Sequence, residues 1–329
     1  MSAETPANKD AVPPDVRLKD PRKAFQMDAK WRGPFFFVQG ADPQFGMFDG
    51  FLRGKTDPKL ISWEEDIALM RIAANDLNKM TPLPAFFVIC GDLVHEFDVN
   101  PLKKAQERDL LRILADIDPA IPIALIPGNH DIQNTPTALA INHFKDTFGP
   151  DYYTFDARGL RCICINSQFF KSFEATPSAE FLQLQKDFFR WFDGEIDRTA
   201  HDLRTGLIQH AVVFQHIAWF LERPDEPDDY FNVDYQIRQI YLQKLVYAGI
   251  KACFCGHYHR NGGGKAGPHG ELEVVVTSAI GMTLAVGTDG QLVEGKADNP
   301  SGMRVVKVTD ESITHDYFPL HEFPTEVKL

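Results

Sequence analysis

The stretch IPIALIPGNHD occupies residues 121–131 and decides how the rest of the chain is interpreted. Its first part, Ile121–Pro127, is apolar over the length of a buried strand. Its second part, Gly128-Asn129-His130-Asp131, is a glycine followed by three polar residues. Packing alone does not explain such polar residues directly after an apolar strand. The stretch therefore predicts a strand that ends in a turn carrying functional side chains.

The same arrangement recurs at four other places, where an apolar run leads into metal-binding residue types. The runs at 35–38, 86–90, 208–214 and 251–255 are followed by Asp42 and Gln44, by Gly91-Asp92, by His216, and by Gly256-His257-Tyr258-His259. In an open α/β sheet, ligands gather at the carboxyl ends of the strands, so these five ends should converge on one spot. The glycines at 91, 128 and 256 allow the backbone to turn sharply there.

These side chains form a mixed set of donors. Carboxylate, amide oxygen and imidazole suit Mn, Fe, Zn or Mg rather than copper. Two such ions about 3.5–4 Å apart could share Asp92, which is an arrangement used for in-line phosphoryl displacement. A lone Gly-Asp is usually a turn and a lone histidine is usually structural, but chance is a poor explanation for all five elements in order.

The pattern of predicted elements indicates an α/β fold with antiparallel additions. Helices are expected after Ser62 and at about 101–117, 137–148, 179–199 and 234–248, between the apolar strands. The segments 271–276, 303–308 and 312–318 alternate apolar and polar residues, as antiparallel strands do. No repeat or linker divides the chain, which favours one domain over 33–320, a flexible extension at 1–32 and a tail at 321–329.

Composition excludes several classes of function. The net charge of −12 would repel a nucleic-acid backbone, and the longest apolar runs are far too short to span a membrane. The first residues have no basic segment followed by an apolar one, so we expect no secretory signal. The five cysteines include two C-x-C pairs within apolar runs, which predicts buried thiols in a reducing, cytoplasmic environment.

The ordered motifs D-x-Q, G-D, G-N-H-D, H and G-H-x-H resemble those of the calcineurin-like metallophosphoesterases, whose first motif is D-x-H. The sequence around these motifs, at 33–46, 128–137 and 256–263, is similar to that of a cytosolic subgroup of the family with serine/threonine phosphatase activity. The resemblance covers roughly residues 33–320. It implies a four-layer α/β/β/α sandwich of two mixed sheets flanked by helices.

The same resemblance implies roles for individual residues. One metal would be held by Asp42 and His259, Asp92 would bridge, and the second metal would be held by Asn129, His216 and His257. The two cations would lower the pKa of water to about 7 and so supply hydroxide for attack on phosphorus. His130 would act as general acid or as a stabiliser of the transition state beside the leaving oxygen. Asn129 could also touch the phosphate.

One residue departs from the family pattern, because Gln44 stands where the family has histidine. An amide oxygen is a weaker and harder ligand than imidazole, so the first metal should be looser or shifted toward Mg or Mn. Alternatively, Gln44 only hydrogen-bonds a water bound to the metal.

Four weaker features have more than one interpretation or none that is functional. His95 either helps to orient the site or is an ordinary loop histidine, and Arg260 either clamps the phosphate or forms a surface salt bridge. The acidic segment 222–235 is either a solvated loop or a gate that selects basic or phosphopeptide substrates. Residues 262–265 lack the spacing of a phosphate-binding loop, which predicts a flexible rim.

Three functions are compatible with these features. The first is a phosphomonoesterase that acts on phosphoserine or phosphothreonine in proteins. The second is a phosphodiesterase or nucleotide hydrolase, because the same pair of metals cleaves diesters. The third is a metal-poor scaffold that binds partner proteins. The expected partners are phosphoproteins or small phosphoesters, with no nucleic acid and no membrane.

Overall fold

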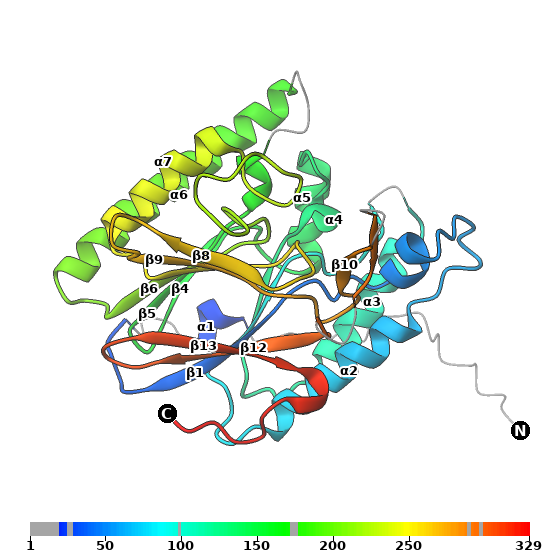
Figure 1. The fold of residues 1–329 in the computed structure, drawn as a ribbon, viewed down its shortest axis with the longest axis horizontal. Helices are drawn as coiled ribbons and strands as arrows, with labels where there is room; N and C mark the ends of the chain where they lie inside the picture. The colour runs from blue at the N-terminus through cyan, green and yellow to red at the C-terminus, as the bar shows by residue number, and fades with distance from the viewer. Residues whose placement is uncertain (1–19, 25–28, 98–99, 172–176, 288–290, 296–298) are drawn as a thin grey trace, which may run out of the picture.

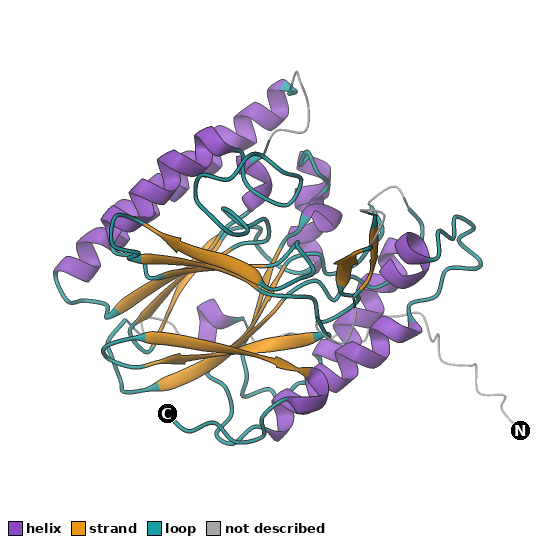
Figure 2. Cartoon of the chain, in the orientation of Figure 1, coloured by secondary structure: helices purple, strands orange, loops and turns teal. Residues whose placement is uncertain are grey.

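The computed structural model describes residues 20–24, 29–97, 100–171, 177–287, 291–295 and 299–329. Two twisted β-sheets lie face to face at its centre, and helices cover their outer faces (Figure 1). The two sheets and the helices outside them are easily distinguished when the ribbon is coloured by secondary structure (Figure 2). The expected α/β/β/α sandwich is therefore confirmed.

The first sheet has the strand order β13-β12-β1-β2-β3. Its strands are β1 (Phe35–Gly40), β2 (Phe87–Cys90), β3 (Ile123–Ile126), β12 (Gly302–Val308) and β13 (Ile313–Pro319). β1, β2 and β3 are parallel, and Val88 lies opposite both Gln39 and Ala124. β12 and β13 are antiparallel additions at one edge. Helices α2 (Glu64–Lys79) and α3 (Lys103–Leu114) pack on the outer face.

The second sheet has the strand order β4-β5-β6-β7-β9-β8. Its strands are β4 (Tyr153–Ala157), β5 (Leu160–Cys164), β6 (His210–Phe214), β7 (Ala252–Cys255), β8 (Gly262–Ala266) and β9 (Leu272–Val276). β5, β6, β7 and β9 are parallel, whereas β4 and β8 close the two edges in antiparallel fashion. Helices α6 (Ala179–Arg204) and α7 (Tyr235–Ala248) cover the outer face, as Figure 1 shows.

Three apolar layers lie between the four layers of secondary structure, because successive side chains of a strand point to opposite faces. Along β1, Phe36 packs toward α2 and α3 whereas Phe37 faces the second sheet. Along β7, Phe254 faces the first sheet whereas Cys253 and Cys255 face α6 and α7. Each C-x-C pair therefore occupies one face of its strand. All five cysteines are buried free thiols, as expected.

Several elements differ from the sequence-based prediction. Residues 262–266 form the edge strand β8 and not a flexible rim, and a β-carbon at Gly263 would collide with the carbonyl oxygen of Val274 in β9. The glycines thus allow close pairing where side-chain alternation gives no strand signal. A small hairpin of β10 (Leu284–Val286) and β11 (Leu292–Glu294) was not predicted. Helix α6 continues to Arg204, five residues beyond its expected end.

Short helices complete the described chain. They are α1 (Pro21–Ala24), a π-helical turn at Phe48–Leu52, α4 (Asn129–Ile132), α5 (Ala138–Thr147), and 3₁₀ turns at Ser167–Phe170 and Leu320–Glu322. In the described part of the chain, no helix is both long enough and apolar enough to cross a bilayer.

Both ends of the described chain contact the core. The Trp31 ring packs against Phe35, and Phe323 and Val327 are buried beneath α2. Residues 1–19 and 25–28 of the expected extension lie outside the described residues. The boundaries at 32 and 320 therefore stay predictions.

Candidate metal centre

The predicted ligands converge where the parallel strands of both sheets end. Asp42 and Gln44 follow β1, Asp92 follows β2, Asn129 follows β3, His216 follows β6, and His257 and His259 follow β7. Hydrogen bonds join these turns: His257 N donates to Asp42 Oδ2 at 3.0 Å between the two sheets, and Gln44 N donates to Asp92 O at 3.0 Å within the first sheet. The structure therefore brings all seven residues to one place.

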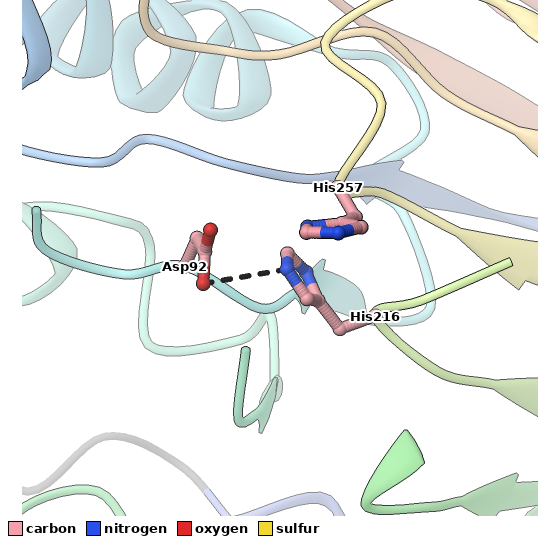
Figure 3. A group of neighbouring side chains, drawn as sticks. All are labelled: Asp92, His216 and His257. Atoms are coloured by element: carbon pink, nitrogen blue, oxygen red, sulfur yellow. Dashed lines mark ion pairs between the residues drawn. The ribbon is translucent and has the colours of Figure 1, made fainter. Parts of the chain in front are cut away.

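Two groups of three side chains each place their ligand atoms within 4.8 Å of one another. One group is Asp92, His216 and His257, and the other is Asp42, Asp92 and His259. Figure 3 shows the first group, in which the carboxylate of Asp92 and the two imidazole rings face a common centre. Asp92 belongs to both groups and is the residue expected to bridge.

The imidazole rings are oriented by backbone carbonyl groups, which can only accept hydrogen bonds. His216 Nδ1 donates to Cys90 O at 2.8 Å, and His259 Nδ1 donates to Met282 O at 2.6 Å. His257 instead uses Nε2, which donates to Tyr230 O at 3.3 Å. Nε2 of His216, Nε2 of His259 and Nδ1 of His257 are thus the nitrogens left for a metal, His216 once its Nε2 proton has been displaced. Such carbonyl contacts fix the tautomer of histidines that bind metals.

The backbone at the site adopts the left-handed region that side chains usually avoid. Positive φ angles occur at Asp42 (52°), Gln44 (37°), Asp92 (49°), His257 (67°) and His259 (53°), and at only two other non-glycine residues of the described chain. Each such residue costs about 1–3 kcal/mol. The fold bears this strain at the residues whose side chains must point inward.

Three glycines make room for the ligands, as their positions after the strands suggested. A β-carbon at Gly128 would collide with the carboxylate and backbone nitrogen of Asp92, and one at Gly91 would collide with the His216 ring. One at Gly256 would lie 2.5 Å from Asp42 Oδ2. These glycines therefore form a cradle that any side chain would fill.

The two buried carboxylates have only histidines as ion-pair partners within the described chain. His216 Nε2 lies 3.3 Å from Asp92 Oδ1, and His259 Nε2 lies 3.5 Å from Asp42 Oδ1. Burial, opposed in part by the charge on His216, raises the pKa of Asp42 well above its ordinary value. Burial also acts on Asp92, but the charges on His216 and His130 lower the pKa of Asp92 below its usual range.

His216 acts as a partial counter-ion to the Asp92 carboxylate. Burial lowers its pKa, but the adjacent Asp92 carboxylate outweighs burial and raises the pKa of His216 to about 9. Burial lowers the pKa of His259 to about 4 and that of His257 well below its ordinary value. The protein therefore keeps two imidazoles neutral and needs positive charge beside its carboxylates. This donor set fits divalent cations.

The side-chain oxygen of Gln44 is a further candidate for a metal-ligand atom. Its side chain is buried, its Oε1 has no hydrogen-bond partner, and its Nε2 lies 3.3 Å from His95 Nδ1. Burial, reinforced by the charge on His130, lowers the pKa of His95 to about 3, so His95 is neutral and accepts from the amide. His95 thus turns the Gln44 oxygen away from itself. An orphaned buried oxygen on a residue that lines the same cavity as Asp92 needs a partner that the described chain does not supply, as a metal ligand would.

His130 lies in the cavity wall next to these residues. Its ring is stacked between His95 and Phe97, with centroid distances of 4.8 Å and 4.6 Å. Its backbone N–H donates to Asp92 Oδ1 at 2.9 Å, and its Nδ1 donates to the carbonyl of His95. Nε2 is therefore the nitrogen left for a substrate, and burial lowers the pKa of His130.

The turn that carries Asn129 and His130 is fixed by two residues whose positioning roles were not predicted. Asp131 accepts hydrogen bonds from Gly128 N at 2.7 Å and from Leu93 N at 3.0 Å. Lys103 Nζ, from α3, donates to the carbonyls of His130 and Asp131. Asn129 Oδ1 thereby lies 3.2 Å from His216 Nε2.

The structure does not place Arg260 among the described residues that line the cavity. Its guanidinium lies 3.9 Å from the centroid of the Tyr258 ring and 5.7 Å from that of Phe231. Its role as a phosphate clamp therefore stays a prediction without a contact to support it.

The segment 222–235 reaches the site with its aromatic residues and not with its acidic ones. Tyr230 and Phe231 line the cavity, and the Tyr230 hydroxyl accepts from Asn129 Nδ2 at 3.2 Å. Glu226 instead accepts from backbone N–H groups of its own loop, including Leu221 N at 2.7 Å. The acidic character of the segment thus stabilises the loop.

The cavity beside the ligands has a volume of about 240 Å³. Its apolar lining consists of Met47, Phe51, Tyr230, Phe231, Leu284 and Leu292, and sequence reasoning missed all of these except Tyr230 and Phe231, which lie in the segment that was considered as a gate. Only the Tyr-Phe pair inside an otherwise acidic loop offered a signal in the sequence. The others come from segments without periodicity.

Solved structures share the architecture. A dimetal phosphatase from Danio rerio has a TM-score of 0.55 at 14% identity, with 87% of this chain and all of that chain covered. The purple acid phosphatase from yellow lupin has a TM-score of 0.58 at 11% identity, with 90% of this chain and 53% of that chain covered. These likenesses establish the fold.

Sequence comparison establishes the family. The model of the calcineurin-like phosphoesterases matches residues 62–261. Serine/threonine-protein phosphatase CPPED1 of Homo sapiens is 42% identical over 300 residues, which cover 90% of this chain and 87% of the human protein. CPPED1 of Danio rerio is 38% identical over 293 residues, which cover 89% of this chain and 87% of the zebrafish protein. The chain therefore belongs to the calcineurin-like phosphoesterase family and is a metal-dependent phosphoester hydrolase.

Proposed function

We propose that this protein removes phosphate from phosphoserine and phosphothreonine residues of proteins. The observation that carries the proposal is the pair of ligand groups that share Asp92 where the two sheets meet. The choice of substrate is supported by relatives that are named serine/threonine-protein phosphatases and are about 40% identical over most of this chain.

Two divalent ions fit the site. Asp42, Gln44, Asp92 and His259 would hold one ion, and Asp92, Asn129, His216 and His257 would hold the other. When bound, such a pair supplies Lewis acidity, which lowers the pKa of water and neutralises charge on phosphoryl oxygens. The amide oxygen of Gln44 favours a hard ion such as Mn or Mg at the first position.

His130 is proposed as the group that protonates the leaving oxygen. Its Nδ1 is engaged by the carbonyl of His95, so Nε2 is the nitrogen that can hold the transferable proton. Burial lowers the pKa of the free imidazole. A phosphate dianion beside the ring favours the imidazolium form, because an opposite charge raises the pKa of a histidine. The stack between His95 and Phe97 holds the ring in place for that transfer.

Asn129 is proposed to orient the phosphoryl group as well as to bind metal. Its Oδ1 points to His216, whereas its Nδ2 donates to the Tyr230 hydroxyl in the cavity. An amide nitrogen at that place can donate to a phosphoryl oxygen.

We also propose a cytoplasmic location and no nucleic-acid partner. Five buried, unpaired cysteines suit a reducing compartment. A net charge of −12 disfavours a polyanionic partner.

Hydrolysis assays with added Mn²⁺ test the proposal. The substrates are a phosphoserine peptide, para-nitrophenyl phosphate and its bis-ester, and the proteins are the wild type and Asp92→Asn. We expect Mn²⁺-dependent hydrolysis of the two monoesters, and a loss of at least about 10³-fold in kcat for Asp92→Asn. Asp225→Asn, which changes an exposed carboxylate of the 222–235 loop, should retain wild-type activity.

Other outcomes assign the other functions. Preferred cleavage of the bis-ester would make the protein a phosphodiesterase. Absence of Mn²⁺-dependent hydrolysis in both proteins would support a scaffold.

A further inference from the structure

We infer that the apolar side of the cavity is a subsite for an apolar side chain adjacent to the phosphorylated residue of a peptide substrate. This inference rests on the proposed function, because it assumes that the phosphoester is presented by a protein. It adds a specificity that the family assignment does not contain.

The cavity has two unlike sides. The polar side is formed by Gln44, Asp92, His95, Asn129, His130, His257 and His259. The apolar side consists of the other lining residues, Met47, Phe51, Tyr230, Phe231, Leu284 and Leu292, and it adjoins the polar side, because the Phe231 ring lies 5.3 Å from that of His257. A phosphoryl group on the polar side therefore places the rest of the substrate against apolar groups.

Three separate segments build the apolar side. Phe51 comes from the π-helical turn after β1 and is 44% exposed. Leu284 and Leu292 lie on the hairpin strands β10 and β11 and share one face of the hairpin, because Leu292 pairs with Val286, two residues after Leu284. Phe231 comes from the loop before α7. Their convergence on one cavity is not a by-product of a single helix or strand.

The hairpin and loop residues of the apolar side are held by packing within the protein. Leu284 packs with Met47, Phe48 and Met282 in a buried cluster, against which Leu292 also packs. The Phe231 ring makes edge contacts with Tyr230 at 5.1 Å and with Tyr258 at 5.3 Å. A preformed apolar wall binds an apolar group without a further cost of ordering.

The charges of the described lining residues disfavour a basic or acidic occupant of this subsite. Among the described lining residues there is no lysine or arginine, and the single carboxylate, that of Asp92, is paired with His216. A charged side chain placed against the apolar wall would lose its hydration without gaining a partner. The acidic residues of the 222–235 loop do not line the cavity.

The size of the cavity favours one side chain beside the phosphate. Cavities that bind drug-sized ligands span roughly 300–1,000 Å³. The cavity here, at about 240 Å³, is smaller than that range. It therefore suits a phosphoryl group with one neighbouring side chain better than a whole nucleotide.

Phosphoserine peptides that differ only in the residue X after phosphoserine test the inference. X is Leu, Phe, Ala, Asp or Lys, and kcat/KM is measured by phosphate release with Mn²⁺ present. We expect Leu and Phe to exceed Ala by about tenfold, and Asp and Lys to fall below Ala. The series is repeated with X before phosphoserine, since the structure does not set the direction of the peptide. Binding of the matching phosphonate peptides, which are not cleaved, should show the same order by calorimetry.

The variant Phe51→Ala should bring the ratio of the Leu to the Ala peptide down toward one. Tyr247→Ala is the matched control, because Tyr247 is an aromatic residue on α7 that is 84% exposed and does not line the cavity. It should keep the wild-type ratio.

Equal kcat/KM for all peptides, or a preference for Lys or Asp, would overturn the subsite and leave the proposed function intact. Preference for a phosphotyrosine peptide over the whole series would also overturn it, because the apolar side would then hold the phosphorylated ring itself. Hydrolysis of para-nitrophenyl phosphate with no hydrolysis of any peptide would instead overturn the proposed function.

Discussion

The two sheets contribute different chemistry to one site. The turns after β1, β2 and β3 carry side chains with oxygen atoms, those of Asp42, Gln44, Asp92 and Asn129, whereas the turns after β6 and β7 carry the imidazoles of His216, His257 and His259. The first half alone is a pair of buried carboxylates that repel each other. The second half alone is a set of imidazoles of which two are kept neutral by burial. Cations bound between the halves would satisfy both.

Because of this difference, bound ions would link residues of the first sheet to residues of the second sheet. Removal of metal by a chelator should produce the largest effect on stability, because ions that bind only the folded protein stabilise it by mass action. Each ion at a hundredfold its dissociation constant contributes about 2.7 kcal/mol to the free energy of unfolding, so two contribute about 5 kcal/mol. Urea denaturation with Mn²⁺ or with chelator measures the difference.

The control for that measurement is Asp92→Asn, whose stability should not respond to the chelator. Equal unfolding curves of the wild type with Mn²⁺ and with chelator would show that metal binding does not stabilise the protein.

Metal affinity should rise with pH, because the protonated ring of His216, which is paired with the Asp92 carboxylate, must lose a proton before it can bind an ion. The pKa of His216 is raised to about 9, so at pH 7 the ring is protonated and an ion must displace that proton. Affinity should therefore increase about tenfold per pH unit from pH 7 toward pH 9, from His216 alone, and level off above it. Calorimetry in buffers of different ionisation enthalpy counts the released protons. An affinity independent of pH would show that His216 is already neutral.

Gly128→Ala should disturb the oxygen half from the backbone side. The added methyl group would collide with the Asp92 carboxylate and backbone, so we expect a loss of about 1–3 kcal/mol in stability and weaker metal binding. The matched control is Gly194→Ala in α6, where a β-carbon would have no neighbour within 4 Å. That variant should gain about 0.5–1 kcal/mol, because alanine is the better helix former. Similar responses of the two variants would show that the site does not require a glycine at position 128.

Gln44→His should have the smallest effect of these changes. It places an imidazole among the oxygen-bearing side chains of the first sheet. We expect the first ion to bind about tenfold more tightly, with a shift in preference from Mg toward Zn. Titration with each metal measures the change, and Gln236→His, at an exposed position of α7, controls for the added histidine. Unchanged affinity would mean that Gln44 does not touch the ion.

The sequence predicted the residues of the site better than its surroundings. Asp42, Asp92, Asn129, His130, His216, His257 and His259 could be found because each follows an apolar run that forms a strand, and strand ends of both sheets meet. The orientation of the imidazoles could not be predicted, since it depends on the carbonyls of Cys90, Tyr230 and Met282. Positive φ angles at five of the converging residues could not be predicted from the sequence, because none of the five is glycine.

The limits for the fold have similar physical causes. β8 consists largely of glycines, which give no alternation of apolar and polar residues. Phe51 and Leu292 lie in a turn and a short hairpin, and they meet only because the loops of the first sheet and the hairpin converge on the cavity. Periodicity identifies buried faces of regular elements, whereas the substrate side of this cavity is built from irregular ones.

The loop before α7 joins two properties that are often treated as independent. Through its main chain, Tyr230 holds the His257 ring, and through its hydroxyl it meets Asn129, while Phe231 next to it forms part of the cavity wall. A change in this loop that alters which substrates are accepted will also alter how firmly an ion is retained. Variants selected for new specificity at this loop should therefore need compensating adjustments in metal supply or in the opposite ligands.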